Sequence, residues 1–357
     1  MLPILFTISI PGGWAPLVLA LVAVALGVWQ ARAVQVAGEP KSAVLQTFGL
    51  WTAGSYAAFF VLVRALGDPG QQNLFALTRA LSIPLHTYGL LIATAFLVAI
   101  WLAGRTAARA GLDGDKVTDL SFWLLLSGMV GSRILFIIVN WDDYSKDLTS
   151  VFAFWKGGFV FYGGFIGATA TALWYTRAHK LEFLPYADVL APSVSIGHAI
   201  GRLGCFAAGC CWGGACDTHF ALAAHFPPES LAYQSQLGHG LIHSGALTTI
   251  GIHPTQLYEA FGELMIFAAL SFWRTRKKFN GEILAMYLML YAPLRSVVEA
   301  LRGDEERGRA FNFLGAWARH AWWNLSTSQL ISVGIFAGGV ALYVLAGRAA
   351  RGSEATA

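Results

Sequence analysis

The chain has 357 residues, of which 56% are hydrophobic and only 12% are charged, and its formal net charge is +4. Soluble domains carry about 25% charged residues, so this composition excludes an ordinary soluble domain and indicates a polytopic membrane protein. The net charge is small, and we expect no nucleic acid among the partners.

Nine apolar segments predict an all-α, polytopic helical bundle, because several of them have the roughly 20 residues that a helix needs to cross hydrocarbon. They lie near residues 14–32, 46–66, 84–104, 119–140, 157–176, 188–210, 255–273, 282–301 and 328–347. Residues 1–31 hold no charge and lack the basic start of a signal peptide, so we expect a retained helix there. We find no internal repeat, which disfavours an inverted-repeat transporter.

The lysines and arginines of the loops predict the orientation of the chain. One alternating set of loops holds thirteen of them and the opposite set holds seven. The richer set is expected to be cytoplasmic, which places the N-terminus outside and the C-terminus inside. The longest loop, about 212–254, contains no Lys or Arg and then lies on the outer face.

Ionisable side chains interrupt the predicted spans, and each costs roughly 2.5–3.5 kcal/mol or more at the bilayer centre if it is unpaired. They are Arg133, Asp188, Arg202, Glu259, Glu263, Arg295 and Glu299. Such residues either lock helices together as ion pairs or mark a substrate path. The three arginines favour a path for an anionic ligand.

The spacing of the polar residues supports a phosphate site. Tyr291, Arg295, Glu299 and Arg302 are 4, 4 and 3 residues apart and therefore share one helix face. Arg202 stands in "IGRLG", where flanking glycines allow the close approach of a headgroup or of another helix. Since guanidinium groups bind phosphate with two hydrogen bonds and stay charged, these arginines suit a phospholipid phosphate.

Two further features leave alternatives open. Glycine pairs in "KGGFVFYGGFIG" (156–167) indicate close helix packing, above all at Gly167, and Gly163 and Gly164 are also candidates for backbone contact with a ligand. His198 is expected to be a satisfied core histidine, with a neutral proton relay as the alternative.

Seven stretches occur in the order that is typical of one protein family. They are "LHTYGLLIATAFLVAIWLA" (85–103), "GSRILFIIVN" (131–140), "GGFVFYGGFIG" (157–167), "ADVLAPSVSIGHAIGRLGCF" (187–206), "HPTQLYEA" (253–260), "YAPLRSVVEALR" (291–302) and "STSQLISV" (326–333). Together they resemble the bacterial prolipoprotein diacylglyceryl transferase family. The resemblance implies a seven-helix core over 84–347, a two-helix N-terminal extension over 1–83, and a cytoplasmic tail over 348–357.

The resemblance also implies the reaction and its partners. The family transfers the diacylglyceryl group of phosphatidylglycerol to the lipobox cysteine thiol of a preprolipoprotein, forming a thioether and releasing glycerol phosphate. The implied protein is an enzyme of the bacterial inner membrane, without cofactor or metal, and we favour a monomer. By resemblance, Arg202 and Arg295 hold the phosphate and Asp188 is a structural partner near the same cavity. The remaining polar site is expected to include Tyr88, Arg133, Tyr162, Gly163, Gly164, Cys205, Cys210, Tyr291, Glu299 and Arg302.

The chain departs from the family at two motifs. Tyr162 stands where the family usually has the histidine of His-Gly-Gly, which is often proposed as the base, so the identity of the base is open. Cys205 takes the place of an asparagine, and Cys210 takes that of a glutamate.

All four cysteines, Cys205, Cys210, Cys211 and Cys216, lie within twelve residues. Their even number on an exported face favours a structural disulfide, with the pairing undetermined. The alternatives are a catalytic thiolate near Arg202, a zinc site, and inert packing. The zinc site would use Cys211, Cys216, His219 and His225.

Two other functions remain as alternatives. One is a related enzyme that uses its own cysteine or another acceptor, and the other is a non-catalytic protein that binds lipids or lipoproteins. Retention of Arg202, Arg295 and Glu299 argues against the second, because unneeded buried charges are costly.

Overall fold

The architecture was taken from a computed structural model that describes residues 4–10, 24, 28, 81–145, 150–151, 157–217, 220–303 and 325–356. The predicted spans near 14–32 and 46–66 lie outside the described residues, apart from Val24 and Val28, which are helical. The chain divides into two compact units. One contains residues 4–86, and the other contains everything from Thr87 onward.

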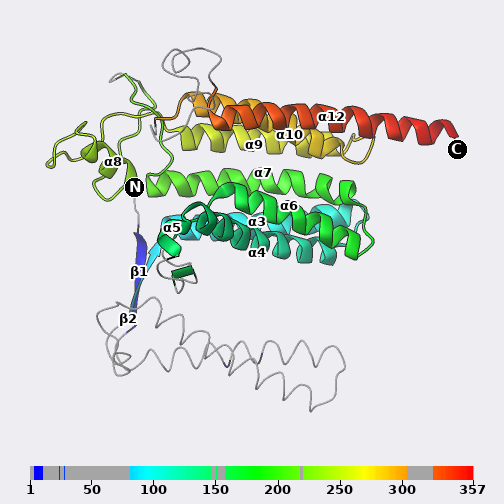
Figure 1. Cartoon of the computed structure of the whole chain (residues 1–357), viewed down its shortest axis with the longest axis horizontal. Coiled ribbons are helices and arrows are strands. Elements are labelled where there is room, and N and C mark those ends of the chain that lie inside the picture. Colours follow the sequence, from blue (N-terminus) through cyan, green and yellow to red (C-terminus); the bar gives the residue numbers. More distant parts are fainter. Residues whose placement is uncertain are drawn as a thin grey trace. The chain divides into compact units, whose positions relative to one another are not determined.

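The larger unit is a helical bundle (Figure 1). Its long helices are α3 (Thr87–Arg109), α4 (Gly114–Val139), α6 (Phe161–Ala178), α7 (Phe183–Ala208), α9 (Thr255–Arg274), α10 (Glu282–Ala300) and α12 (Thr327–Thr356). Each of the seven predicted core spans corresponds to one of these helices. Five of the described helices, α3, α4, α7, α10 and α12, are long and apolar enough to cross a membrane. The predicted helical membrane fold is therefore confirmed.

Two strands in the smaller unit were not expected from the sequence. β1 (Ile4–Ile10) pairs antiparallel with β2 (Leu81–His86), with Ile8 opposite Ile83. The sequence predicted a helix from residue 84, whereas α3 begins at Thr87. Pro84 explains the difference, because proline lacks a backbone N–H and biases the residue before it away from helical geometry.

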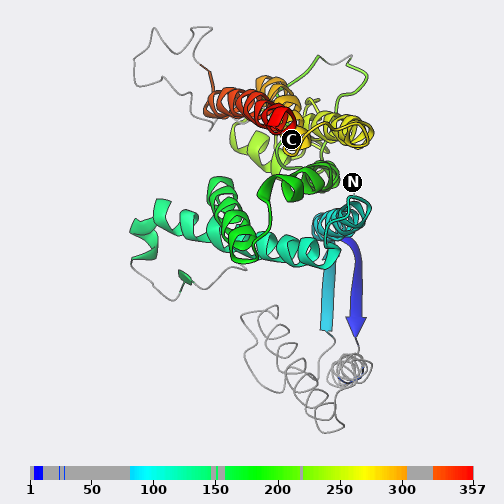
Figure 2. The same ribbon diagram turned by 90° about the vertical axis from the view of Figure 1, so that its right-hand side faces the viewer.

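Helix α7 lies between two groups of helices, with α3, α4 and α6 on one side and α9, α10 and α12 on the other (Figures 1 and 2). Small residues permit this position. A Cβ added at Gly197 would lie 3.2 Å from Cβ of Ala99 on α3, and one at Gly204 would lie 3.4 Å from Cδ2 of Tyr88. Ala191 and Ala199 of α7 are buried as well. The central helix is therefore in contact with both groups and carries Arg202 into the middle of the bundle.

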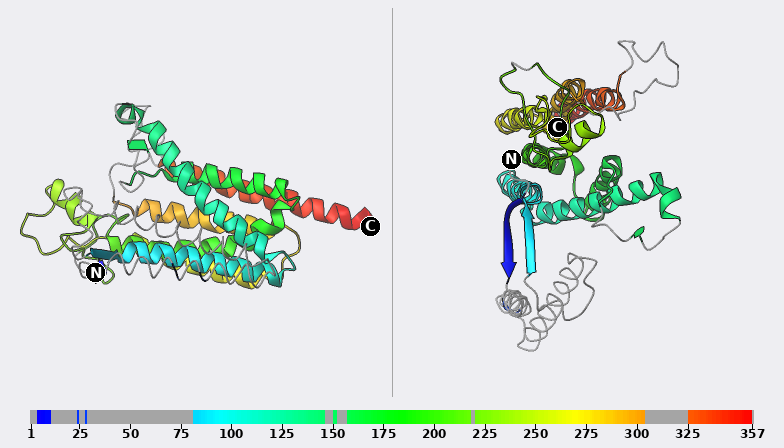
Figure 3. Two further views of the ribbon diagram at one scale, coloured as in Figure 1. Left: turned by 90° about the horizontal axis from the view of Figure 1, so that it is seen from below. Right: turned by 90° about the vertical axis from the view of Figure 1, so that its left-hand side faces the viewer.

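Glycines also bring α4 and α6 together, which Figure 3 shows side by side. A Cβ added at Gly163 would collide with the carbonyl oxygen of Gly131, and one at Gly167 would lie 2.6 Å from that of Ser127. Gly164 lies in the same way against Gly128 and Ser132. The glycine pair of α6 thus serves helix packing in this structure, the interpretation that the sequence favoured for Gly167.

We expect Gly163→Ala to destabilise the protein by about 1–3 kcal/mol, since the added methyl group overpacks the α4–α6 contact. Gly334→Ala on α12 is the matched control, because no atom lies within 4 Å of the Cβ position there. Thermal unfolding of both variants in the same detergent measures the difference. Equal melting temperatures for the two variants would contradict this packing role.

A small head region joins α7 to α9 at one end of the bundle, which we call the cysteine end. It contains α8 (Leu231–Gly238) and a core of Ala224, Phe226, Ala232 and Ile252. The backbone N–H groups of Gly213 and Gly214 donate to the carbonyls of His253 and Leu301, at 2.9 Å each. The segment after α7 is thereby fixed against the start of α9 and the end of α10.

Candidate active site

A network of polar side chains joins α7 to α9 inside the bundle, and we call it the polar core: Ser195, His198, Arg202, Glu259 and Glu263. Nη2 of Arg202 lies 2.5 Å from Oε2 of Glu259, and Nδ1 of His198 lies 2.8 Å from Oε1 of Glu263. The hydroxyl of Ser195 donates to Oε2 of Glu263 at 2.5 Å. Both glutamates are almost completely buried, so their charges depend on these partners.

Helical spacing explains why these side chains meet. Ser195, His198 and Arg202 are three and four residues apart on α7, and Glu259 and Glu263 are four apart on α9, so each set occupies one face. The sequence showed both glutamates as charges inside a span but gave no reason to pair them with α7. The site prediction therefore omitted Glu259, the direct partner of Arg202.

Helix α10 brings a second arginine to the same level of the bundle. Nη2 of Arg295 lies 2.8 Å from Oε2 of Glu299, one turn further along the helix, and 3.3 Å from the hydroxyl of Ser328 on α12. The rings of His198 and Tyr291 are 5.8 Å apart, which joins α7 to α10. Arg202 follows His198 by four residues on α7, and Arg295 follows Tyr291 by four residues on α10. The two helices run in the same direction. Both guanidiniums therefore lie about 6 Å beyond that ring contact.

Each of these two arginines has one buried donor that no described residue engages. Among the described residues, no acceptor bonds to the buried Nε of Arg202 or to the buried Nη1 of Arg295. Their side chains are only 13% and 14% exposed. A buried donor without an acceptor is unfavourable, and an anionic ligand that accepts from both groups removes that cost.

Three sulfur atoms gather where α7 ends, and we call this group the cysteine cluster: Cys205, Cys210 and Cys211. The three Sγ atoms lie within 4.8 Å of one another. Nη1 of Arg202 is 4.0 Å from Sγ of Cys205, so the cluster adjoins the polar core. All four cysteines are free thiols, so the expected disulfide is not formed in this structure.

The backbone of the cluster is held in an unusual conformation. Gly209 ends α7 with φ 64°, and Cys211, which has a side chain, adopts φ 60°. Nε2 of Gln256 donates to the carbonyl of Cys210 at 2.6 Å, and the Thr255 hydroxyl donates to that of Cys211 at 2.9 Å. The first residues of α9 therefore fix the backbone of both cysteines.

The thiols influence one another. Hydrogen bonds with Cys205 and then Cys210 lower the pKa of the Cys211 thiol, and the positive charges of Arg302 and Arg202 act in the same direction. Hydrogen bonds with Cys205 and Cys211 raise the pKa of the Cys210 thiol. The ionisation of any one of these thiols therefore depends on the other two.

The zinc site expected from Cys211, Cys216, His219 and His225 is not assembled among the described residues. Cys216 is not part of the cysteine cluster, and Nδ1 of His225 lies 3.1 Å from the carbonyl oxygen of Thr249. His219 lies outside the described residues.

Tyr88 and Tyr162 occupy different surroundings. Tyr88 is the second residue of α3 and packs against Gly204, which places it beside the cysteine cluster. Tyr162 is 40% exposed on α6, where its ring lies 5.9 Å from that of Phe161. Helix α6 packs mainly on α4, whereas the polar core joins α7 to α9.

Arg133 binds backbone carbonyls. Nη1 of its guanidinium donates to the carbonyl of Gly157 at 2.6 Å, and Nη2 donates to that of Ser150 at 3.1 Å. These contacts hold the segment before α6, and the expectation that Arg133 completes the phosphate site stays a prediction. The backbone of Arg302 forms a bridge with Gly213, next to the cysteine cluster.

Asp188 lies at the opposite end of α7 from the cysteines. Its carboxylate accepts hydrogen bonds from the backbone N–H of Gly281 at 2.8 Å and of Leu284 at 2.9 Å, and Nζ of Lys277 is 3.2 Å away. These contacts satisfy the first turn of α10. Asp188 has the expected structural role, but the expectation that it shares a cavity with Arg202 is wrong. Fourteen residues of helix separate the two by about 21 Å.

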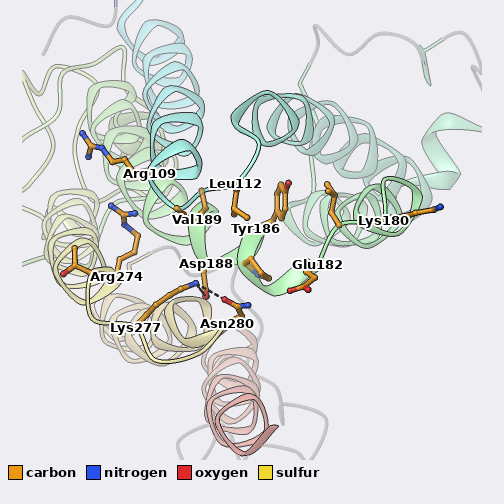
Figure 4. A pocket seen from close by; sticks show the side chains of 14 residues that line it. Arg109, Leu112, Lys180, Glu182, Tyr186, Asp188, Val189, Arg274, Lys277 and Asn280 are labelled. Carbon is orange, nitrogen blue, oxygen red and sulfur yellow. Dashed lines mark hydrogen bonds and ion pairs between the residues drawn. The ribbon is translucent and has the colours of Figure 1, made fainter. Parts of the chain in front are cut away.

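A cavity of about 940 Å³ surrounds Asp188 (Figure 4). Basic side chains line it, namely Arg109, Lys180, Arg274 and Lys277. It lies at the end of the bundle away from the cysteines, so it is separate from the site built around Arg202.

Comparison with known proteins points to one family. The sequence family described as prolipoprotein diacylglyceryl transferase matches residues 75–345. A phosphatidylglycerol–prolipoprotein diacylglyceryl transferase of Finegoldia magna is 32% identical over 265 residues, which cover 73% of this chain and 91% of that relative. The enzyme of the same name from Geobacillus kaustophilus is 33% identical over 222 residues, or 62% of this chain and 78% of the relative.

Proposed function

Since this chain belongs to the prolipoprotein diacylglyceryl transferase family, we propose that its polar core and Arg295 hold phosphatidylglycerol during transfer to a protein thiol. The chain is a transferase that spans the membrane several times. Its reaction moves the diacylglyceryl group of phosphatidylglycerol to the lipobox cysteine of a preprolipoprotein. A thioether forms and glycerol phosphate leaves.

One observation carries the assignment of the phosphate site. Arg202 and Arg295 lie at the same level on neighbouring helices, and each keeps a buried N–H without an acceptor among the described residues. A phosphate placed between them accepts both hydrogen bonds. As the carbon–oxygen bond breaks, negative charge grows on the departing phosphate. Fixed cations stabilise that charge without having to reorganise.

The nearby acids keep the arginines in place. Glu259 pairs with Nη2 of Arg202 and Glu299 pairs with Nη2 of Arg295, which leaves Nε of Arg202 and Nη1 of Arg295 for the lipid. Tyr88, Tyr291 and Arg302 are proposed to border the same site, near the ester groups and the glycerol. Gly163 and Gly164 act through the packing of α6 in this proposal, and no longer as ligand contacts.

We place the protein in the bacterial inner membrane, with the cysteine end outside, the N-terminus outside and the C-terminus in the cytoplasm. The four basic residues around Asp188 support this orientation, since basic side chains concentrate on the cytoplasmic side. Residues 1–83 are proposed to be an addition to the catalytic core. A monomer is sufficient for the site, because one chain supplies both arginines.

The decisive experiment is transfer by the purified protein. Phosphatidylglycerol and a lipobox peptide are supplied, and the peptide is analysed by mass spectrometry for added diacylglyceryl. A peptide with serine in place of the lipobox cysteine is the matched control. Rescue of a bacterium depleted of its own transferase is the test in cells. A diacylglyceryl group on the protein's own cysteine favours the alternative enzyme, and binding without any transfer favours the non-catalytic alternative.

We expect Tyr162→Phe to keep at least about a tenth of wild-type activity. A free phenol titrates near 10, so its hydroxyl is a poor base at neutral pH. Tyr162 is also exposed on α6, away from the contacts of the polar core. Initial rates at saturating lipid measure the effect, with thermal unfolding as the check on folding. A stable but inactive variant would assign the proton transfer to the Tyr162 hydroxyl.

A further inference from the structure

We propose that the cysteine cluster binds one zinc-class metal ion through three thiolates, and that the open fourth position takes the thiol of the protein substrate. This inference rests on the proposed function, since it assigns the step that activates the acceptor. The arginines of the phosphate site bind the leaving group and do not perform that step, and the cluster lies directly beside them.

The spacing of the sulfurs suits such an ion. Tetrahedral zinc with zinc–sulfur bonds of about 2.3 Å separates its sulfur ligands by ~3.8 Å. The three Sγ atoms already lie within 4.8 Å of one another, so shifts of about 1 Å or less complete the geometry. Three protein ligands and one open position are typical of catalytic zinc, whereas structural zinc has four protein ligands. Thiolate ligands favour soft metals over magnesium or calcium.

The backbone is organised to bring the third sulfur into the cluster. Cys211 adopts a left-handed conformation with φ 60°, which glycine adopts freely and a residue with a Cβ adopts at a cost. The chain has glycine at the neighbouring left-handed position 209 but a cysteine at 211. Gln256 and Thr255 hold the two carbonyls, as outer residues around a metal site commonly do. These contacts fix the backbone that carries the two thiols before any ion binds.

The charge of the site is also suitable. Three thiolates and one Zn²⁺ carry a net charge of −1, which rises to −2 when a substrate thiolate joins. Nη1 of Arg202, at 4.0 Å from Sγ of Cys205, partly offsets that charge. The same guanidinium is proposed to hold the lipid phosphate, so the bound thiol and the lipid become neighbours.

The reaction needs a means of removing the thiol proton, and the carboxylates beside the two arginines already carry ion pairs, although Oε1 of Glu259 accepts no hydrogen bond among the described residues. Glu259 pairs with Arg202, and Glu299 pairs with Arg295. Both ring nitrogens of His198 face carboxylates, Nδ1 toward Glu263 at 2.8 Å and Nε2 toward Glu259 at 3.5 Å. A thiol that coordinates a metal ion is deprotonated outright, so the ion performs this step without a free base.

The step balances without any oxidant or reductant. The substrate thiol loses its proton to water on coordination, and its sulfur then attacks the glyceryl carbon that bears the phosphate. The sulfur–carbon bond forms as the carbon–oxygen bond breaks, and the electron pair leaves on the phosphate oxygen. Glycerol phosphate departs and takes up one proton from water.

The test measures metal content before activity. The full chain is purified under reducing conditions, dialysed, and analysed for zinc, and Co²⁺ is then titrated in as a spectroscopic probe of thiolate ligands. We expect about one zinc per chain and a thiolate–cobalt absorption band. Cys205→Ser, Cys210→Ser and Cys211→Gly are expected to lose both. Cys216→Ser is the matched control and is expected to keep both, because Cys216 lies outside the cluster.

Cys211→Gly guards against a trivial loss by unfolding, since glycine relieves the left-handed backbone while removing the sulfur. Equal zinc in the wild type and in all three cluster variants would mean an adventitious ion only and would overturn the site. Transfer at an unchanged rate in metal-free protein would overturn the role in activation while leaving the transferase assignment intact. Zinc bound by the cluster in a protein that transfers nothing would support the site and refute the proposed function.

Discussion

Arg202→Ala is expected to lower kcat/KM for diacylglyceryl transfer by at least about 100-fold, the effect of removing a fixed donor from developing negative charge. The variant loses the unpartnered Nε that is proposed to bind phosphate. It also leaves Glu259 buried without its cation, which costs about 3–5 kcal/mol of stability. Both consequences follow from one side chain, so stability and catalysis must be separated by experiment.

The double variant Arg202→Ala/Glu259→Gln makes that separation. Neutralising Glu259 removes the unpaired buried charge, so the double variant should regain much of the lost stability and remain inactive. Thermal unfolding and transfer to a lipobox peptide are measured on the same preparations. If activity returns together with stability, Arg202 is a structural residue and the phosphate site is wrongly assigned.

Arg295→Lys is expected to reduce transfer nearly as much as Arg295→Ala, by roughly 100-fold. A lysine keeps the positive charge, but its ammonium cannot pair with Glu299 and Ser328 while presenting a second, fixed N–H to phosphate. Stability should therefore fall less for the lysine variant than for the alanine variant. The rates of the two variants should nevertheless remain close.

Kinetics with phosphatidylglycerol and with the peptide distinguish the role of Arg295. If it binds the phosphate only as the carbon–oxygen bond breaks, kcat falls and KM for the lipid changes little. Near-normal transfer by Arg295→Lys would show that charge alone is sufficient and would contradict the two-point contact.

The helices of the core were predictable because lipid imposes a simple pattern. A span must be apolar over about 20 residues, and five of the seven described core helices, α3, α4, α7, α10 and α12, meet that condition. The start of α3 was not predicted correctly, since a hydropathy window does not detect the effect of Pro84 on the backbone. The pairing of β1 with β2 joins segments more than 70 residues apart and leaves no local signal.

The candidate site was predictable in its arginines but not in their partners. Arg202 and Arg295 stood out because charges inside a span are costly. Arg133 stood out for the same reason, but the sequence did not indicate that its guanidinium binds the carbonyls of Ser150 and Gly157. The sequence analysis also placed Asp188 near the cavity of Arg202, because residues on the same long helix can share a face and still lie at different depths. The assignment of Glu259 to Arg202 required knowledge of which helices are neighbours.

The positions of these partners in the sequence determine the order in which the contacts can form during synthesis. Arg295 and Glu299 share a helix and pair as soon as α10 forms. The charged residues of α7 pair instead with segments that are synthesised later. Gly281, a partner of Asp188, follows Asp188 by 93 residues, and Glu259 follows Arg202 by roughly 60. At synthesis rates of about 5–20 residues per second, α7 exists for about 3–20 s before its charges are neutralised. During that interval the unpaired charges of α7 make its insertion into lipid unfavourable. We therefore expect α7 to remain next to the insertion machinery until α9 and α10 emerge.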